Sequence, residues 1–113
     1  MSDNCLFCKI INGDIPSDKL YEDDDIFAFR DIAPQAPVHF LVIPKKHISG
    51  PAEVSGEDEQ IMGRMMRTAS KIAKDEGIEH YRLVYNNGEE AGQTVFHIHM
   101  HVLGGRNLGW PPG

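Results

Sequence analysis

The sequence lacks the features of exported and membrane-spanning proteins. Its first residues, MSDNCLFCKIING, contain no basic segment followed by a long apolar run, and no stretch approaches the ~20 apolar residues that a membrane-spanning helix needs. Only two cysteines occur, Cys5 and Cys8, which is too few for the disulfide framework of a small secreted domain. We therefore expect a cytoplasmic protein that makes no contact with a membrane.

The chain also lacks an excess of basic residues. Eleven Lys and Arg face 17 Asp and Glu, giving a net charge of -6 and a pI of about 5.4. A surface of this sign disfavours binding to nucleic acid, so we expect no nucleic-acid partner, and any phosphate ligand must be small. Internal repeats and long linkers are absent as well, so the 113 residues predict one domain spanning residues 1–113.

What the sequence does contain is an alternation of short helical and extended patterns. Apolar residues at helical spacing over residues 6–11 follow Asn4, a good N-cap, and Gly13 supplies a stop. A longer helix is predicted from Ser55, which precedes acidic residues, to Gly77. Segments rich in β-type residues predict strands. They lie at residues 25–31, 38–44, 81–86 and 94–103. The pattern predicts an α+β fold with the long helix on one face of a sheet.

The long predicted helix carries an apolar stripe about 140° wide, broader than contact with one sheet requires. Two interpretations stay open: a wide core face, or a surface buried against a second subunit. The stripe comprises Ile61, Met62, Met65, Met66, Ala69, Ile72 and Ala73.

The stretch FHIHMHVLGG, residues 96–105, places His97, His99 and His101 at every second position. In a strand these side chains share one face, while the apolar residues between them share the other and pack on the core. We therefore expect the histidines to line an open surface or cleft. The apolar face comprises Phe96, Ile98, Met100 and Val102.

Three alternating histidines suit two kinds of chemistry. One metal held by all three is awkward, because the outer pair would lie ~13 Å apart along an extended strand, although adjacent pairs could chelate. The favoured use is covalent, since neutral imidazole attacks phosphorus well and leaves well from the adduct. The loop NNGEEAGQT, which precedes the histidines directly, offers glycines and a hydroxyl for a phosphate cradle.

HIHMHVL resembles the signature of the histidine triad (HIT) superfamily. FRDIAPQAPVHFLVIPKKHIS, NNGEEAGQTVFHIHMHVLGGR and WPPG resemble its Hint branch of purine nucleoside phosphoramidases. This resemblance implies a HIT-like fold: a mostly antiparallel sheet with one long helix and one short N-terminal helix, and a sheet that extends across a homodimer. It also implies that the tail, residues 104–113, lies near the partner's active site, where Trp110 would contact substrate.

The resemblance further implies the site residues. His99 would attack the α-phosphorus of a nucleoside 5'-phosphoramidate such as adenosine 5'-monophosphoramidate, and water would hydrolyse the nucleotidyl-histidine to release nucleoside monophosphate. His101 would contact the phosphate and assist proton transfer, His97 and His39 would orient and polarise the site, and Asp31 would accept the ribose hydroxyls. The phosphate would be bordered by Asn86, Gly92, Gln93 and Thr94. The base slot would be lined by Leu6, Phe7, Ile10, Ile15, Phe29, Ile32 and Leu41.

The CLFC spacing of Cys5 and Cys8 suits tetrahedral zinc, with His47 and His97 as further candidate ligands. Some bacterial-type members of the resembled family carry such a Cys2His2 zinc, whereas others lack both cysteines. We expect a structural zinc and no cofactor for catalysis; unligated cysteines and a redox pair are the alternatives.

Three other functions stay open at this point. A metallohydrolase could use the histidine triad to hold catalytic zinc, and a regulatory module could bind nucleotides with only incidental turnover. Dinucleoside polyphosphate hydrolysis, typical of a related HIT branch, is the nearest enzymatic alternative, although the terminal WPPG favours the Hint interpretation.

Overall fold

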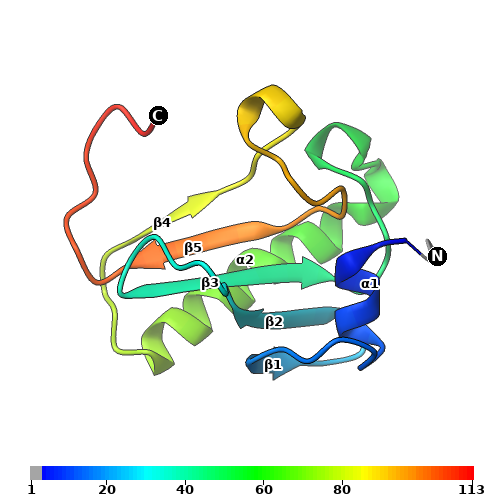
Figure 1. Cartoon of the computed structure of the whole chain (residues 1–113), viewed down its shortest axis with the longest axis horizontal. Helices are drawn as coiled ribbons and strands as arrows, with labels where there is room; N and C mark the ends of the chain where they lie inside the picture. The colour runs from blue at the N-terminus through cyan, green and yellow to red at the C-terminus, as the bar shows by residue number, and fades with distance from the viewer. Residues whose placement is uncertain (1–3) are drawn as a thin grey trace.

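The structure, a computed structural model, describes residues 4–113, so residues 1–3 of the expected domain lie outside the described part. Within residues 4–113 five strands form one antiparallel sheet in the order β1-β2-β3-β5-β4 (Figure 1). The strands are β1 (Lys19–Glu22), β2 (Ile26–Arg30), β3 (Val38–Pro44), β4 (Tyr81–Val84) and β5 (Met100–Gly104). The last strand in the chain therefore lies inside the sheet, between β3 and β4.

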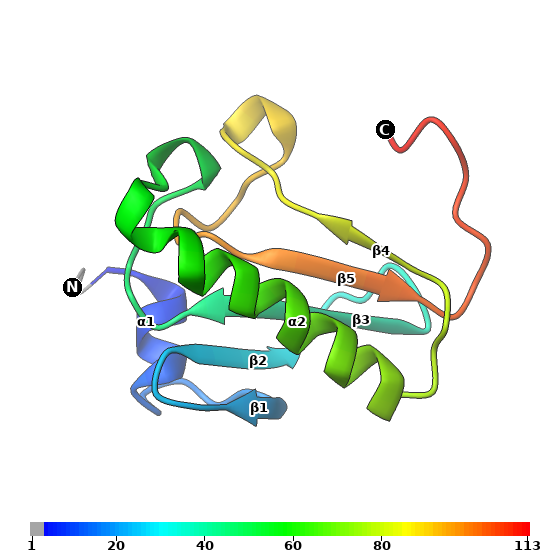
Figure 2. The same cartoon turned by 180° about the vertical axis from the view of Figure 1, so that it is seen from behind.

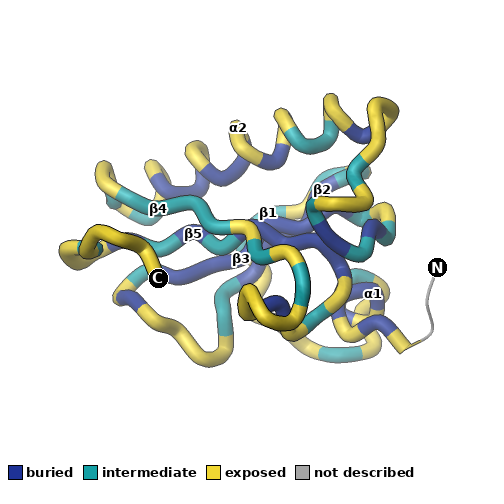
Figure 3. Tube along the Cα trace, turned by 90° about the horizontal axis from the view of Figure 1, so that it is seen from above, coloured by how far each residue is buried: buried dark blue, intermediate teal, exposed yellow. Residues whose placement is uncertain are grey.

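Two helices lie on opposite faces of this sheet. Helix α2 (Glu59–Asp75) runs across one face, as Figure 2 shows, and the shorter α1 (Leu6–Ile11) lies on the other (Figure 3). The α2 face has its own buried apolar cluster, which includes Phe40, Val42, Met65, Met100 and Val102. The α1 face has a second cluster, which includes Phe7, Ile10, Phe29, Leu41 and Ile43.

Strand β3 is covered on both of its faces. Its side chains from His39 to Pro44 are all buried, with alternate residues belonging to the two apolar clusters. Burial on both faces explains why VHFLVIP is a nearly continuous apolar run and not an alternating one. Helix α1 covers only part of its face, and the histidines His39 and His101 lie on that same face beyond it.

The predicted helices are confirmed with changed ends. The first helix matches residues 6–11, but Cys5 and not Asn4 is its N-cap, because the Cys5 sulfur accepts the backbone N–H of Cys8. The second helix was predicted from Ser55; a 3-10 turn (Gly56–Asp58) precedes α2, and a capping box between Ser55 and Asp58 fixes that turn.

The apolar stripe of α2 is only partly a core face. Met65, Ala69, Ile72 and Ala73 are buried under the helix. Ile61 and Met62 pack at the margin of that cluster, whereas Met66 is 55% exposed. The core interpretation is therefore right for most of the stripe, and Met66 is left at the surface of the single chain.

One strand was not predicted from the sequence, and one predicted strand is shorter than expected. The unpredicted strand is β1, a four-residue edge strand with a register shift between Lys19 and Tyr21. The strand predicted over residues 94–103 begins only at Met100, because β3 pairs with β5 no further than Val42. Phe96 was therefore assigned to the core wrongly; it is 49% exposed, whereas Ile98, Met100 and Val102 are buried.

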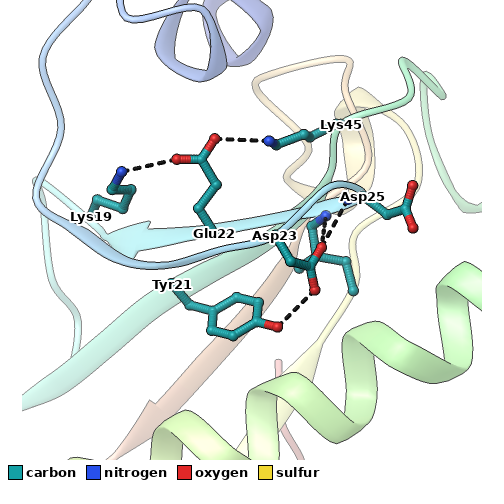
Figure 4. Close-up of polar contacts among 7 residues, drawn as sticks. Lys19, Tyr21, Glu22, Asp23, Asp25 and Lys45 are labelled. Carbon is teal, nitrogen blue, oxygen red and sulfur yellow. Dashed lines mark hydrogen bonds and ion pairs between the residues drawn. The ribbon is translucent and has the colours of Figure 1, made fainter.

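The turn between β1 and β2 is held by Asp23. Its carboxylate accepts the backbone N–H groups of Asp25 and Ile26 and the hydroxyl of Tyr21 (Figure 4). From α2, the Arg64 guanidinium bridges Asp23 and Asp25 at 3.0 and 2.6 Å. These contacts tie the edge of the sheet to the helix that covers it.

Candidate functional site

The three histidines of the motif do not form one cluster. Their ligating atoms divide between two groups, each with members within 4.8 Å of one another: Cys5, Cys8, His47 and His97 in one, and Asp31, His39 and His101 in the other. His99 lies between the two groups, and its ring is 5.0 Å from that of His101. In the described residues 4–113 the triad therefore offers no common metal site, which argues against a catalytic zinc held by all three histidines.

His99 is fixed by the backbone. Its Nδ1 lies 2.8 Å from the carbonyl oxygen of His97, and since a carbonyl oxygen only accepts, Nδ1 must carry the proton. Nε2 of neutral His99 therefore holds the lone pair. Burial lowers the pKa of His99, and the Phe7 ring packs edge-on against the imidazole at 5.0 Å. The arrangement supplies an oriented, neutral imidazole with one nitrogen able to attack.

His97 is fully buried, which corrects the expectation that all three histidines line an open surface. It donates from Nε2 to the backbone oxygen of Pro44 at 2.7 Å, so its Nδ1 lone pair is directed at the cysteines. Burial lowers the pKa of His97 to about 4. The imidazole of His97 therefore belongs to the group that contains Cys5 and Cys8, which we call the cysteine group. The hydrogen bond from His99 is accepted by the carbonyl oxygen of His97 and not by its ring.

The cysteine group fits a tetrahedral metal ion. Nδ1 of His97 lies 3.3 Å from Cys5 Sγ and 3.6 Å from Cys8 Sγ, and Nδ1 of His47 lies 3.5 Å from Cys8 Sγ. The sulfur-to-nitrogen edge of a tetrahedral zinc site is roughly 3.5 Å, given Zn–S of about 2.3 Å and Zn–N of about 2.0 Å. The donor set matches zinc, and the bond from His97 to Pro44 is the kind of outer contact that orients a ligating histidine.

The second group is a hydrogen-bonded pair beside a carboxylate. Nε2 of His39 lies 2.9 Å from Nδ1 of His101, and an Asp31 carboxylate oxygen lies 3.4 Å from the same His39 nitrogen and 3.9 Å from His101 Nδ1. The other oxygen of Asp31 accepts the backbone N–H of Ala33 at 2.8 Å. Asp31 thus holds the turn after β2 and also faces the histidine pair.

The backbone N–H of Gln35 settles which nitrogens of this pair carry protons. It donates to His39 Nδ1 at 3.0 Å, so that nitrogen is an acceptor and Nε2 carries the proton. His39 therefore donates to His101 Nδ1, and neutral His101 carries its proton on Nε2. Burial lowers the pKa of both residues, that of His101 to about 4. With these nitrogens already engaged, the group is a poor metal site despite its composition.

The loop expected to border a phosphate lies directly before the histidines, but its residues differ in role. Gln93 is buried, and its side chain bonds only backbone: it accepts from Gly88 and donates to Ser49 and Val95. Gly92 has a φ of +98°, which favours glycine, and a Cβ there would be 3.7 Å from the Asn86 side chain. Gln93 therefore shapes the loop, whereas Gly92 and Thr94 are exposed and Asn86 is half-buried.

Most of the expected base-slot residues gather on the α1 face. Phe7, Ile10, Phe29 and Leu41 belong to one buried cluster, and Ile15 packs against it. Leu6 and Ile32 lie outside the cluster and are 43% and 98% exposed. The slot residues are thus divided between a packed floor and two solvent-facing apolar side chains.

The tail leaves the sheet after β5, and Trp110 is 84% exposed. Arg82 holds the tail by donating to the backbone oxygen of Gly109 at 2.7 Å.

In residues 4–113 no helix is long and apolar enough to cross a membrane.

Two contributors to the site were missed by the sequence analysis, the backbone oxygen of Pro44 and the backbone N–H of Gln35. Both act through main-chain atoms, which the residue type does not reveal. The only available signal was position: Pro44 ends the strand predicted over residues 38–44, and Gln35 lies in the connection before it.

Comparison with known proteins adds independent support to this geometry. Residues 12–108 match the family model described as HIT domain. A protein of Synechococcus elongatus named as an uncharacterized HIT-like protein is 53% identical over 114 residues, covering 100% of both chains.

Solved structures match the whole fold. The crystal structure of a HIT family hydrolase from Legionella pneumophila has a TM-score of 0.95 at 51% identity and covers 97% of this chain and 100% of that one. A HIT family hydrolase from Clostridium thermocellum has a TM-score of 0.94 at 48% identity and covers 96% of each chain. The expected α+β fold, with one long helix, a short N-terminal helix and an antiparallel sheet, is confirmed.

Proposed function

We propose that this chain hydrolyses purine nucleoside 5'-phosphoramidates. The premise is that the chain belongs to the HIT domain family and has the fold of HIT family hydrolases. The observation that supports this most directly is the state of His99. Its Nδ1 proton is held by the His97 carbonyl, so the Nε2 lone pair is the nucleophile. A neutral, oriented imidazole suits attack on phosphorus without help from a metal.

The reaction would proceed in two displacements. In the first, His99 Nε2 forms a bond to the α-phosphorus as the bond from phosphorus to the amine nitrogen breaks. The resulting imidazolium keeps its Nδ1–H on the His97 carbonyl, which stabilises the positive charge. In the second, water attacks phosphorus, the bond to Nε2 breaks, and nucleoside monophosphate leaves with the return of neutral His99.

The departing amine would take a proton from solvent, and His101 would hold the phosphoryl group while the bond to nitrogen breaks. Nε2 is the ring nitrogen of His101 that is not engaged with His39, and its side chain is 20% exposed. Because His39 donates to Nδ1, His101 keeps its proton on Nε2 and would donate that N–H to a phosphoryl oxygen, which stabilises the negative charge of the transition state. The attacking water returns a proton in the second displacement, so the protons balance over one turnover.

The remaining residues would bind the nucleotide. Asp31 would accept the ribose hydroxyls, because a carboxylate has acceptor sites beyond those facing Ala33 and His39. Exposed Thr94, Gly92 and the Asn86 amide would face the phosphate, with the loop held by Gln93. The base would lie on the apolar floor of the α1 face, next to Leu6 and Ile32, whose exposure leaves them available for contact.

Cys5, Cys8, His47 and His97 would hold a structural zinc ion, because the spacing of their donor atoms fits a tetrahedral site. Bound zinc would tie α1 to the histidine segment, and with four protein ligands it would have no open position for water. The side chains proposed to act on the substrate, His99, His101 and Asp31, lie outside this group of four ligands.

A homodimer completes the proposal. Strand β4 is an edge of the sheet with four half-buried residues, and Tyr85 and Met66 nearby are 36% and 55% exposed. Pairing of β4 with its symmetry copy would cover that edge and extend the sheet across two chains. Trp110 would then lie near the partner's active site and contact the leaving group.

A substrate panel tests the reaction. Adenosine and guanosine 5'-phosphoramidates would be compared with diadenosine polyphosphates, with rapid quenching and mass spectrometry to locate a nucleotidyl adduct. The proposal expects faster turnover of phosphoramidates and an adduct on His99. Preferential cleavage of the polyphosphates would assign the chain to dinucleotide hydrolysis, and binding without turnover would make it a nucleotide-binding module.

A further inference from the structure

Arg106, just beyond β5, makes an arrangement of hydrogen bonds to backbone that the proposed reaction does not use. Its Nε and Nη2 both donate to the carbonyl oxygen of Gln35, at 3.2 and 3.0 Å, and its Nη1 donates to the carbonyl oxygen of Asn107 at 3.0 Å. The side chain therefore joins the exit of β5 to the connection between β2 and β3. Residues 35 and 106 are 71 positions apart in the chain, so this is a long-range contact.

The residue that Arg106 holds also sets the protonation of the histidine pair. The N–H of Gln35 donates to His39 Nδ1 at 3.0 Å, and His39 Nε2 in turn donates to His101 Nδ1 at 2.9 Å. One series of hydrogen bonds thus runs from the Arg106 guanidinium through the backbone carbonyl and N–H of Gln35 to His39 and His101. If Gln35 shifts, His39 loses the donor that keeps its proton on Nε2.

The backbone next to Arg106 is closely packed. Gly105 has a φ of +92°, and a Cβ at this position would be 2.9 Å from the Cβ of Pro37. Such an approach is possible only for glycine, so the backbone of the β5 exit lies directly against the β2–β3 connection. Gly105 brings the two segments together, and Arg106 then fixes the carbonyl of Gln35.

We propose that Arg106 is a positioning residue that orients Gln35 and thereby holds His39 in the form that donates to His101. The proposal rests on the proposed function, because it assigns His101 a part in the reaction. Arginine suits the position since two of its nitrogens reach one oxygen while a third holds Asn107. A lysine offers a single nitrogen, which cannot reproduce the planar set of donors.

The first measurement needs no substrate. In 1H–15N spectra of the imidazole groups, wild-type protein should show His39 protonated on Nε2 and His101 accepting on Nδ1. Arg106→Gln should give His39 a mixed population with protonated Nδ1, and Arg106→Lys should lie between the two. Arg64→Gln is the matched control, because it too removes a charged guanidinium; the two hydrogen bonds that it removes lie at the β1–β2 turn.

Kinetics supply the second measurement. Arg106→Gln should lower kcat for phosphoramidate hydrolysis about threefold to tenfold, the range that one net hydrogen bond corresponds to, with KM changed less than about twofold. Arg64→Gln should leave both unchanged. If Arg106 acts through His39, the same substitution in a His39→Ala background should cost less than about twofold.

An unchanged His39 form in both Arg106 variants would overturn the proposal, and so would an equal loss of kcat with and without His39. If Arg106→Gln does not fold, Arg106→Lys carries both measurements, since it keeps the charge and one donor. A wild-type protein inactive on phosphoramidates would refute the proposed function instead, and the spectra would still decide whether Arg106 controls His39.

Discussion

Nδ1 of His99 lies 2.8 Å from the backbone oxygen of His97, so the motif's first residue fixes its second through the main chain and not through its imidazole. This relationship divides the roles of the motif. The ring of His97 faces the cysteines, while the carbonyl of the same residue sets which nitrogen of His99 holds the lone pair.

His99→Ala should abolish turnover and leave nucleotide binding nearly intact. Removal of the attacking nitrogen should lower kcat by at least about 10³-fold, because no other side chain can form the covalent intermediate. Calorimetric titration with nucleoside monophosphate should give a Kd within a few-fold of wild type. Substantial residual hydrolysis by the purified variant would rule out the covalent mechanism.

Asp31→Ala should weaken the binding of ribonucleotides more than that of 2'-deoxynucleotides. Loss of a hydrogen bond to a charged acceptor should cost ribonucleotides about tenfold in Kd and 2'-deoxynucleotides less. Titration of both sugars against Asp31→Ala, with the exposed Asp24→Ala as control, measures the difference. Equal losses for the two sugars would refute the ribose assignment.

Wild-type protein should contain about one equivalent of zinc, and Cys5→Ser/Cys8→Ser should lose it. Thiolate ligands dominate the affinity of such a site, so the variant should also have a lower Tm, and a chelator should lower the Tm of wild type only. Elemental analysis and thermal unfolding provide the readout. His101→Ala should retain the metal; its loss from that variant would instead support a metal held by the triad.

Asp58→Asn should destabilise the protein at pH 7 but much less at pH 3. The hydrogen bond from Lys46 holds the pKa of Asp58 below its usual value, so the folded state binds this proton less readily than the unfolded chain. The stabilisation is therefore present above the unfolded pKa of about 3.9 and is lost as the pH falls through the lower folded value. Urea unfolding at both pH values measures it. Glu57→Gln, which alters the exposed partner of the same lysine, should have little effect; a loss equal to that of Asp58→Asn would contradict the assignment.

Deletion of Trp110 to Gly113 should preserve folding and the His99 adduct but change the ranking of phosphoramidates with different amines. Trp110 is 84% exposed in the single chain, so its removal costs little packing. Competition assays with several amine leaving groups measure the ranking, and sedimentation at micromolar concentration measures the dimer. An unchanged ranking, or a monomeric wild type, would argue against a tail that serves the neighbouring site.

Much of this architecture follows from local chemistry in the sequence. Strand β3 was predicted with its exact residues because VHFLVIP is a long apolar β-type run, and α2 was predicted because Ser55 and the acidic residues after it mark a helix start. Strand β1 was missed because KLYE has only four residues and no regular alternation. Its pairing depends on β2, which local patterns do not report.

The site was predicted less completely, since several of its contacts depend on main-chain atoms from distant segments. The alternation rule placed His97, His99 and His101 on one face, but the chain leaves the ladder before Met100. His97 could then turn to Cys5, a residue 92 positions away. The CLFC spacing did indicate this cluster. The carbonyl of Pro44 and the N–H of Gln35 carry no mark in the residue types, so the protonated nitrogen of each histidine could be read only from the structure.

The strand order has a consequence for synthesis. β5 follows the other four described strands in the chain but lies between β3 and β4, so these two strands have no partner in common until residues 100–104 have been translated. The growing polypeptide can form the β1-β2-β3 meander early. Until β5 pairs with β3, however, the edge of β3 that faces away from β2 stays unpaired, and the apolar side chains beside it stay exposed. His99 and His101 lie in or directly before β5, so the nascent chain acquires the proposed nucleophile only when this segment is made.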